Sequence, residues 1–313
     1  MILRKIWRTL AGFIVPFVVR SARQVHSAAK KGGPSVDKVV LVTGASAGIG
    51  LAIATNLAAA GWTVVGASRR GTASEGWTGL VMDVDDDGSV TAGVRSVIDR
   101  FGHIDALVTC AGWGLAGAVE NTPIADAKAQ LETLFWGTVR VVQAVLPTMR
   151  ANKSGRIVLF SSIGGVIGLP FQAFYSASKF AIEGWGEALA YEVGPFGIKV
   201  TLVQPGNFRT DFTENRRTVK APTTAEETSV GPGQDGGDPY SGAASKAVGI
   251  MERDEQNGAS PETVAKAVRK VLESSRPPRR VSVGKASERA GLIAKKALPF
   301  GVFQAVARGS LGV

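Results

Sequence analysis

The chain of 313 residues has very little of the chemistry that disulfides and metal centres require. It contains one cysteine, Cys110, and two histidines, His26 and His103. A single cysteine excludes an internal disulfide and indicates a reducing compartment. With so few thiols and imidazoles in the chain, we expect no metal site.

The N-terminus lacks an apolar run long enough for a good transmembrane helix. The stretch 10–19 is ten residues long and contains Pro16. At about 1.5 Å per residue it covers about half of a ~30 Å hydrocarbon core. Across residues 1–20, however, apolar and basic positions recur at helical spacing, which predicts an interfacial helix on an anionic membrane. A cleaved secretory signal, an organelle transit peptide and a helix docked on the protein itself are the alternatives.

Acidic residues are almost missing from both ends of the chain. Residues 1–31 hold seven Lys/Arg and no acid, and residues 276–313 hold eight with one acid, Glu288. Each end therefore carries +7, and since the whole chain carries +10, residues 32–275 carry −4. A nucleic-acid-binding core would place its cations within the fold, so this distribution argues against nucleic acid as a partner.

From residue 37 onward, β-branched apolar runs alternate with helical segments. This alternation predicts an α/β fold in one domain, a doubly wound parallel sheet of Rossmann type with three layers. The expected strands are 38–42, 62–67, 80–82, 104–109, 156–160, 198–204 and an edge strand at 280–284. The expected helices are 49–60, 87–101, 122–150, 172–192 and 261–272.

Composition divides the chain into three parts. Residues 1–36 form the basic N-terminal segment and a linker, 37–285 the folded domain, and 286–313 a basic tail. Within the domain, residues 211–258 are rich in Thr, Gly, Asp and Ser. We expect them to form a long loop over the substrate, with one helix at 245–252.

A glycine-rich turn, Gly44-x-x-x-Gly48-x-Gly50, follows the first expected strand and opens the first expected helix. Glycine at such a turn lets backbone N–H groups approach a pyrophosphate, and the helix N-terminus adds a favourable dipole. The context of strand, turn and helix makes the motif a strong indication of dinucleotide binding.

The residues at the end of the second expected strand indicate whether the dinucleotide is NAD or NADP. An NAD enzyme usually has a carboxylate there, whereas this chain has Ser68 followed by Arg69 and Arg70. Guanidinium groups can bind a 2′-phosphate bidentately. The sequence therefore favours NADP over NAD, with Arg69, next to the strand end, as the main contact.

Ser162, Tyr175 and Lys179 form a candidate site for proton transfer. Tyr175 and Lys179 are four residues apart, so on a helix both leave the same face. At about 4 Å and an effective dielectric constant of about 20, the ammonium would favour the phenolate by up to ~4 kcal/mol, about three pKa units. This predicts a tyrosine pKa near neutrality, suited to general acid/base catalysis. The alternative is a helix with a buried tyrosine and a surface lysine.

These motifs occur in the order found in one known family. They are Thr43-Gly44-x-x-x-Gly48-x-Gly50, Asp83-Val84, Ala111-Gly112, Ser162, Tyr175-x-x-x-Lys179 and Pro205-Gly206. Over residues 37–285 the chain resembles the short-chain dehydrogenase/reductase family, single-domain type, and around Tyr175 its hydroxysteroid and retinol dehydrogenase branch. The resemblance implies an NADP-dependent oxidoreductase that interconverts a carbonyl and an alcohol.

The resemblance also implies residue roles. Tyr175 would be the general acid/base, Ser162 would orient the substrate oxygen, and Lys179 would lower the tyrosine pKa and hold the nicotinamide ribose. The cofactor contacts that it implies, besides Tyr175 and Lys179, are Gly44, Ser46, Gly48, Ile49, Gly50, Ser68, Arg69, Asp83, Val84, Ala111, Gly112, Pro205, Gly206, Phe208 and Thr210.

Two positions depart from the family pattern. Cys110 stands where an asparagine usually precedes Ala-Gly, and Leu134 stands where an asparagine usually holds a water that links the lysine to solvent. No side chain at 134 can then hydrogen-bond that water, so proton supply is expected to be slower or rerouted. A second hypothesis is therefore a weakly catalytic nucleotide-binding sensor or scaffold.

Substrate, assembly and location are indicated only broadly. Phe171, Phe174, Phe208 and Phe212 suggest an apolar substrate such as a steroid, retinoid or lipid. The family commonly pairs its two long helices, here 122–150 and 172–192, between subunits, which implies a homodimer or tetramer. We expect a cytoplasmic protein, peripheral on the cytoplasmic face of a membrane if residues 1–20 attach there.

Overall fold

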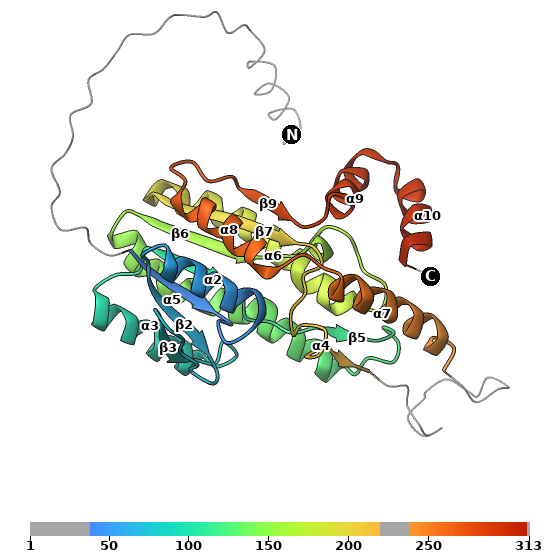
Figure 1. Ribbon diagram of the computed structural model, residues 1–313, viewed down its shortest axis with the longest axis horizontal. Helices are drawn as coiled ribbons and strands as arrows, with labels where there is room; N and C mark the ends of the chain where they lie inside the picture. The colour runs from blue at the N-terminus through green and yellow to red at the C-terminus, as the bar shows by residue number, and fades with distance from the viewer. Residues whose placement is uncertain (1–37, 220–237, 312–313) are drawn as a thin grey trace, which may run out of the picture. The chain divides into compact units, whose positions relative to one another are not determined.

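The structure, a computed structural model, describes residues 38–219 and 238–311 (Figure 1). Its centre is a seven-stranded sheet in the order β3-β2-β1-β4-β6-β7-β9, and every neighbouring pair is parallel. The strands are β1 Val39–Thr43, β2 Thr63–Ser68, β3 Thr78–Val81, β4 Ala106–Thr109, β6 Gly155–Phe160, β7 Ile198–Pro205 and β9 Arg280–Val283. The predicted doubly wound Rossmann-type sheet is confirmed, with β9 at one edge.

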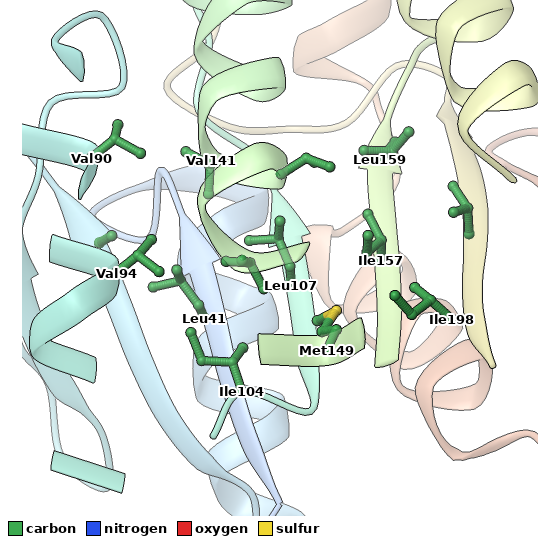
Figure 2. Close-up of a cluster of buried hydrophobic side chains, with 14 of the residues drawn as sticks. Leu41, Val90, Val94, Ile104, Leu107, Val141, Met149, Ile157, Leu159 and Ile198 are labelled. Atoms are coloured by element: carbon green, nitrogen blue, oxygen red, sulfur yellow. The ribbon is translucent and has the colours of Figure 1, made fainter. Parts of the chain in front are cut away.

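Helices cover both faces of this sheet, because successive residues of each strand face opposite ways. In β1, Val39 and Leu41 face a core formed with α3 Asp87–Phe101, α5 Gly137–Ala151 and α6 Ala173–Val193. Figure 2 shows part of this core, including Leu41, Leu107 and Met149. Val40 and Val42 face the second core, formed with α2 Gly48–Ala59 and α8 Pro261–Glu273. The continuous apolar runs of the strands follow from burial on both faces.

The strand order reverses between β1 and β4, which carry the chain to opposite halves of the sheet. At such a switch point the loops after the two strands separate and leave a crevice at the carboxyl ends. The glycine-rich turn follows β1, and Cys110-Ala111-Gly112 follows β4. The sheet topology therefore brings these two segments to one crevice.

The long helix expected at 122–150 is interrupted by one π-helical turn. It consists of α4 Ile124–Leu131, the π turn Glu132–Trp136, and α5. Such turns are rare and often occur at functional sites. Leu134, the position that departs from the family pattern, lies within this turn and is buried.

The C-terminal half contains more regular structure than the sequence indicated. The helix expected at 245–252 is α7 Ser241–Gln256, and a two-residue strand, β8 Arg217–Thr218, pairs in parallel with β5 Leu115–Ala116. The expected basic tail folds into α9 Ala286–Ala297 and α10 Phe300–Leu311. Within 38–219 and 238–311 no helix is both long and apolar enough to cross a membrane. The interfacial helix predicted for residues 1–20 lies outside the described residues.

Candidate active site

A cavity of about 910 Å³ occupies the carboxyl ends of the central strands. Its lining includes every catalytic and cofactor residue that the sequence nominated: Gly44, Ser46, Gly48, Ile49, Gly50, Ser68, Arg69, Asp83, Val84, Ala111, Gly112, Ser162, Tyr175, Lys179, Pro205, Gly206, Phe208 and Thr210. Of the four phenylalanines that suggested an apolar substrate, Phe208 and Phe212 line the cavity, and Phe171 and Phe174 do not. The lining residues come from loops that are far apart in sequence, and the parallel sheet gathers them at one edge.

The glycine-rich turn needs glycine for two physical reasons. Gly44 has φ +67°, and a Cβ there would lie 2.8 Å from backbone atoms of Ala111. At Gly50 a Cβ would lie 2.2 Å from the Gly44 carbonyl oxygen. The Ala111 N–H donates to Thr43 Oγ1 at 3.2 Å, which joins the ends of β1 and β4. The turn is therefore held close to the second loop of the crevice with its backbone uncovered.

Arg70 contacts the glycine-rich turn, whereas the sequence predicted Arg69 as the main cofactor contact. The Arg70 Nη2 donates to Ser46 Oγ at 3.0 Å, while Arg69 is exposed at the cavity wall. Ser68 is buried, and its Oγ has no hydrogen-bond partner among the described residues. Two guanidinium groups and two hydroxyls thus converge at the end of β2, a donor set that suits a phosphate.

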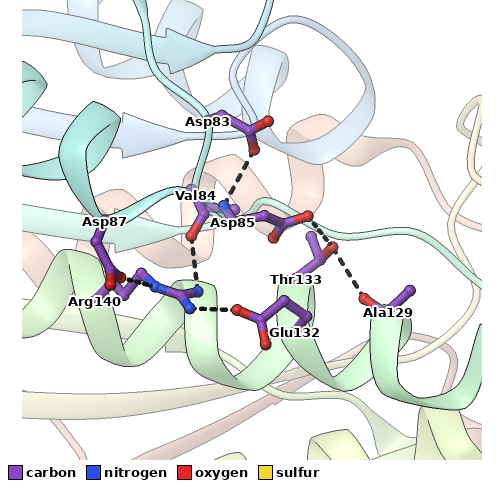
Figure 3. A network of polar contacts seen from close by, with 8 residues as sticks. All are labelled: Asp83, Val84, Asp85, Asp87, Ala129, Glu132, Thr133 and Arg140. Carbon is purple, nitrogen blue, oxygen red and sulfur yellow. Dashed lines mark hydrogen bonds and ion pairs between the residues drawn. The ribbon is translucent and has the colours of Figure 1, made fainter. Parts of the chain in front are cut away.

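A polar network fixes the loop after β3 to the π turn (Figure 3). Arg140 pairs with Asp87 and Glu132 and donates to the Val84 carbonyl oxygen at 3.3 Å. Thr133 Oγ1 donates to Asp85 Oδ2 at 2.8 Å. Burial raises the pKa of Asp85, and the hydrogen bond from Thr133 opposes that rise. The network holds Asp83 and Val84 at the cavity wall.

Ser162 and Tyr175 face the same part of the cavity. Ser162 precedes a 3₁₀ turn, Ile163–Gly165, and its Oγ accepts from the Gly164 N–H at 3.0 Å. Tyr175 lies near the start of α6, and its ring packs edge-to-face on Phe212 with centroids 5.9 Å apart. Burial raises the pKa of the Tyr175 phenol, and hydrogen bonding with Ser162 works in the opposite direction.

Lys179 lies one turn further along α6 and is buried. Its Nζ donates to the Phe160 carbonyl oxygen at 2.8 Å and lies 5.8 Å from the centroid of the Tyr175 ring. Burial lowers the pKa of Lys179 to about 8. The expected face-sharing of Tyr175 and Lys179 is present.

The expectation that Lys179 lowers the pKa of Tyr175 is wrong for this structure. The pKa of Tyr175 is raised rather than lowered, and the charges that act on it are Glu255 and Arg216. The ammonium hydrogen-bonds a main-chain carbonyl, and burial of the phenol is the largest influence on its pKa.

Leu134 packs on Gly112, and Cys110 lies near Lys179. Gly112 packs so closely on Leu134 that a Cβ at 112 would lie 2.5 Å from the leucine Cδ2. The pKa of the Cys110 thiol is strongly raised by burial, although the Lys179 charge lowers it. Cys110 therefore stays a neutral thiol and packs as a small apolar side chain.

The sequence did not predict a polar cluster whose charges act on Tyr175. Arg216 is 1% exposed and pairs with Glu255, which also accepts from Thr213 Oγ1; Arg216 Nη1 lies 3.8 Å from Glu252 Oε1. Glu255, on α7, lines the cavity. These four side chains lie within residues 211–258, which the sequence described as a long loop with one helix at 245–252, so no periodic pattern could have joined them.

Known proteins are similar to this chain over most of its length. The family model described as short chain dehydrogenase matches residues 38–221. A 3-ketodihydrosphingosine reductase of Bacteroides thetaiotaomicron is 41% identical over 248 residues, covering 79% of this chain and 88% of that protein. Retinol dehydrogenase 8 of Bos taurus is 36% identical, covering 78% and 80%.

Solved structures agree on the fold. A short-chain dehydrogenase from Streptomyces avermitilis has a TM-score of 0.71 and 32% identity, covering 87% of this chain and 98% of that one. An alcohol dehydrogenase from Thermococcus sibiricus, complexed with 5-hydroxy-NADP, has a TM-score of 0.62 at 22% identity, covering 80% and 97%. A Burkholderia phymatum relative in complex with NAD has 0.67 at 21%, covering 83% and 92%. Both cofactors therefore occur on this fold.

Proposed function

Because this chain belongs to the short-chain dehydrogenase/reductase family and is an oxidoreductase of CH–OH groups, we propose that it interconverts a carbonyl and an alcohol on a lipid-like substrate, with NADP as cofactor. The observation that carries this proposal is the cavity in which Ser162, Tyr175 and Lys179 share one wall with the glycine-rich turn. The nicotinamide cofactor supplies or accepts the hydride.

In the proposed mechanism Tyr175 is the proton donor for reduction. Its raised pKa keeps the phenol protonated at neutral pH, so the hydroxyl can give its proton to the carbonyl oxygen as that oxygen becomes an alcohol. Ser162 Oγ hydrogen-bonds the same oxygen and orients it. Lys179, with a pKa of about 8, provides a positive charge that favours the phenolate left after transfer.

The cavity supports NADP as the cofactor through four groups at the end of β2. Arg69 and Arg70 would hold the 2′-phosphate, with the hydroxyls of Ser46 and Ser68 as further partners. The glycine-rich turn would accept the pyrophosphate, since Gly44 and Gly50 allow a tight turn in which a Cβ would collide with neighbouring backbone. No carboxylate follows β2, where a ribose 2′-hydroxyl would need one.

The lining suggests an amphiphilic substrate. Leu169, Phe212, Ile250 and Met251 give the substrate end an apolar wall, and Asp254 and Glu255 add carboxylates beside it. The names of relatives include 3-ketodihydrosphingosine, retinol and 17-beta-hydroxysteroid. We propose a ketone with a long apolar body and a hydroxyl or ammonium head that the carboxylates receive.

NADPH oxidation by the purified full chain tests this function. We expect turnover with 3-ketodihydrosphingosine and other long-chain ketones, and much weaker turnover with acetone, which lacks the apolar body. The second hypothesis, a nucleotide-binding sensor or scaffold, is favoured by the packed Leu134, whose side chain cannot hydrogen-bond a relay water. Tight NADPH binding without oxidation by any carbonyl would support the sensor and reject the enzyme.

Assembly and attachment are further parts of the proposal. We propose a homodimer or tetramer that pairs the α4–α5 and α6 helices, because Trp136, Phe180 and Tyr191 expose aromatic side chains there. Light scattering during gel filtration measures the subunit number.

We also propose that residues 1–20 attach the protein to the cytoplasmic face of an anionic membrane. Deleting residues 1–31 should then weaken sedimentation with anionic vesicles, and more so at low salt.

A further inference from the structure

Exposed apolar side chains gather in the segment 286–311, which we call the C-terminal hairpin. Twelve large hydrophobic residues are exposed in the described part of the chain, and five of them lie within residues 293–306. They are Ile293, Leu298, Phe300, Val302 and Val306, with exposed fractions from 39% to 68%. Apolar residues scattered singly need no explanation, whereas a concentration of this kind marks an interaction surface.

Helix α10 of the hairpin has apolar side chains on two sides. One side is buried against the protein, and the other is exposed. Phe303 and Leu292 are buried where α10 meets α9, and Lys295 Nζ lies 4.9 Å from the ring centroids of both Phe300 and Phe303. Val302 and Val306, one turn apart, stay exposed. A helix that is apolar around most of its circumference normally has a partner on each side.

The charge of the hairpin's exposed face indicates an anionic partner. Ile293 is flanked on its own helix face by Arg289 and Lys296, four residues before it and three after it. Glu288 is the last acidic residue of the sequence, and its carboxylate accepts the N–H groups of Asn207 and Lys285 at 2.9 and 2.7 Å. The exposed face is thus cationic, which suits an anionic surface. A second hairpin or the +7 segment 1–31 would be repelled.

The hairpin is attached to the rim of the cavity. Glu288 accepts from Asn207 of the cavity wall, and a Cβ on Gly206 would lie 2.1 Å from Glu288 Oε2. In Figure 1, α9 and α10 follow directly from the end of β9. Any surface that binds the hairpin is therefore held close to the cavity opening.

We propose that the C-terminal hairpin docks on an anionic lipid bilayer. Phe300, Val302 and Val306 enter the boundary between headgroups and acyl chains, and Arg289 and Lys296 contact lipid phosphates. Docking brings the cavity rim to the bilayer, so that a lipid-like substrate passes from membrane to site with little exposure to water. This last consequence rests on the proposed function, whereas the docking does not.

Sedimentation of the full-length chain with vesicles, without cofactor or substrate, tests the docking. Vesicles of phosphatidylcholine with phosphatidylglycerol should bind the wild type, and vesicles of phosphatidylcholine alone should bind it more weakly. The variant F300S/V302S/V306S should partition about tenfold or more weakly. The matched control F196S/V119S/V81S also changes one exposed phenylalanine and two exposed valines, away from the hairpin, and should bind like the wild type.

A second variant tests the charges independently of the apolar contacts. R289Q/K296Q should bind the vesicles that contain phosphatidylglycerol more weakly than the wild type does and change little on phosphatidylcholine alone. Raising the salt from about 0.1 M to about 1 M should weaken wild-type binding in the same way. Equal binding of F300S/V302S/V306S and wild type would overturn the proposal. The proposal would also be overturned if the wild type bound neither kind of vesicle. It would be overturned as well if the hairpin variant differed from the wild type only in subunit number, as measured by light scattering.

Discussion

The Lys179 ammonium donates a hydrogen bond to the carbonyl oxygen of Phe160, the last residue of β6, across 2.8 Å. This contact ties α6 to the strand that precedes Ser162 and leaves the ammonium 5.8 Å from the centroid of the Tyr175 ring. It explains why burial controls the pKa of Tyr175 in the described structure. Lys179 is therefore placed to act on a phenolate once it forms, and Tyr175 stays protonated until then.

Replacing Tyr175 by phenylalanine should abolish turnover and leave NADPH binding nearly intact. The hydroxyl is the proposed proton donor, whereas the ring, packed on Phe212, is preserved by the change. Steady-state NADPH oxidation and NADPH titration by fluorescence measure the two effects. Tyr191→Phe, on the exposed side of the same helix, is the matched control and should behave as wild type. Full activity of Tyr175→Phe would reject the proposed mechanism.

Stability should depend on pH through Lys179. Its pKa is about 8 in the folded chain and has an ordinary value of 10.5, so the unfolded state binds more protons between these values. Wild-type stability relative to Lys179→Met should therefore rise as pH increases above 8, by up to about 2 kcal/mol at pH ~9.5. Above pH ~10 the raised pKa of Tyr175 acts with the opposite sign. Urea denaturation of both proteins at each pH gives the difference, and a constant difference would contradict the pKa shift.

Cofactor choice should depend on the arginines after β2. Arg69→Ala and Arg70→Ala should each weaken NADPH more than NADH, because only NADPH carries the 2′-phosphate. A charge-assisted hydrogen bond contributes roughly 1.5–3 kcal/mol, so the ratio of the two affinities should fall about tenfold or more. Arg70→Ala also removes the contact with Ser46, which fixes that side chain. Arg95→Ala, exposed on α3, serves as the control. Equal losses for both cofactors would mean that the arginines are surface charges only.

Leu134→Asn should reveal whether this position limits proton supply or only packs. The leucine is 2% exposed in the π turn, and an asparagine there would bury an amide beside Gly112. If proton transfer is limiting, the turnover number rises with a smaller solvent isotope effect. The buried amide should at the same time lower the free energy of unfolding by about 1–3 kcal/mol. Leu134→Met, of similar volume and without an amide, is the control for packing. No change in either quantity would show that the position neither packs nor supplies protons.

The sequence by itself determined the architecture and the chemistry that the cavity gathers. Apolar runs such as Val39–Thr43 can only be strands buried on both faces, and their alternation with helices requires a parallel sheet. Glycine at 44 and 50 and the four-residue spacing of Tyr175 and Lys179 are local properties, because backbone sterics and helix periodicity act over a few residues. These features were therefore predictable without any knowledge of long-range contacts.

Only the tertiary structure decided where the charges point and which segments meet. The direction of the Lys179 ammonium depends on a carbonyl 19 residues away, and the contact of Arg70 with Ser46 joins groups 24 residues apart. The Arg216–Glu255 ion pair joins residues 39 apart in the sequence, and the hydrogen bond from the Asn207 N–H to Glu288 joins residues 81 apart. No periodic pattern records such pairings, since they follow from how the sheet stacks its loops. The pKa values of Tyr175 and Lys179 follow in turn from burial, which is a property of the packed molecule and not of the sequence spacing.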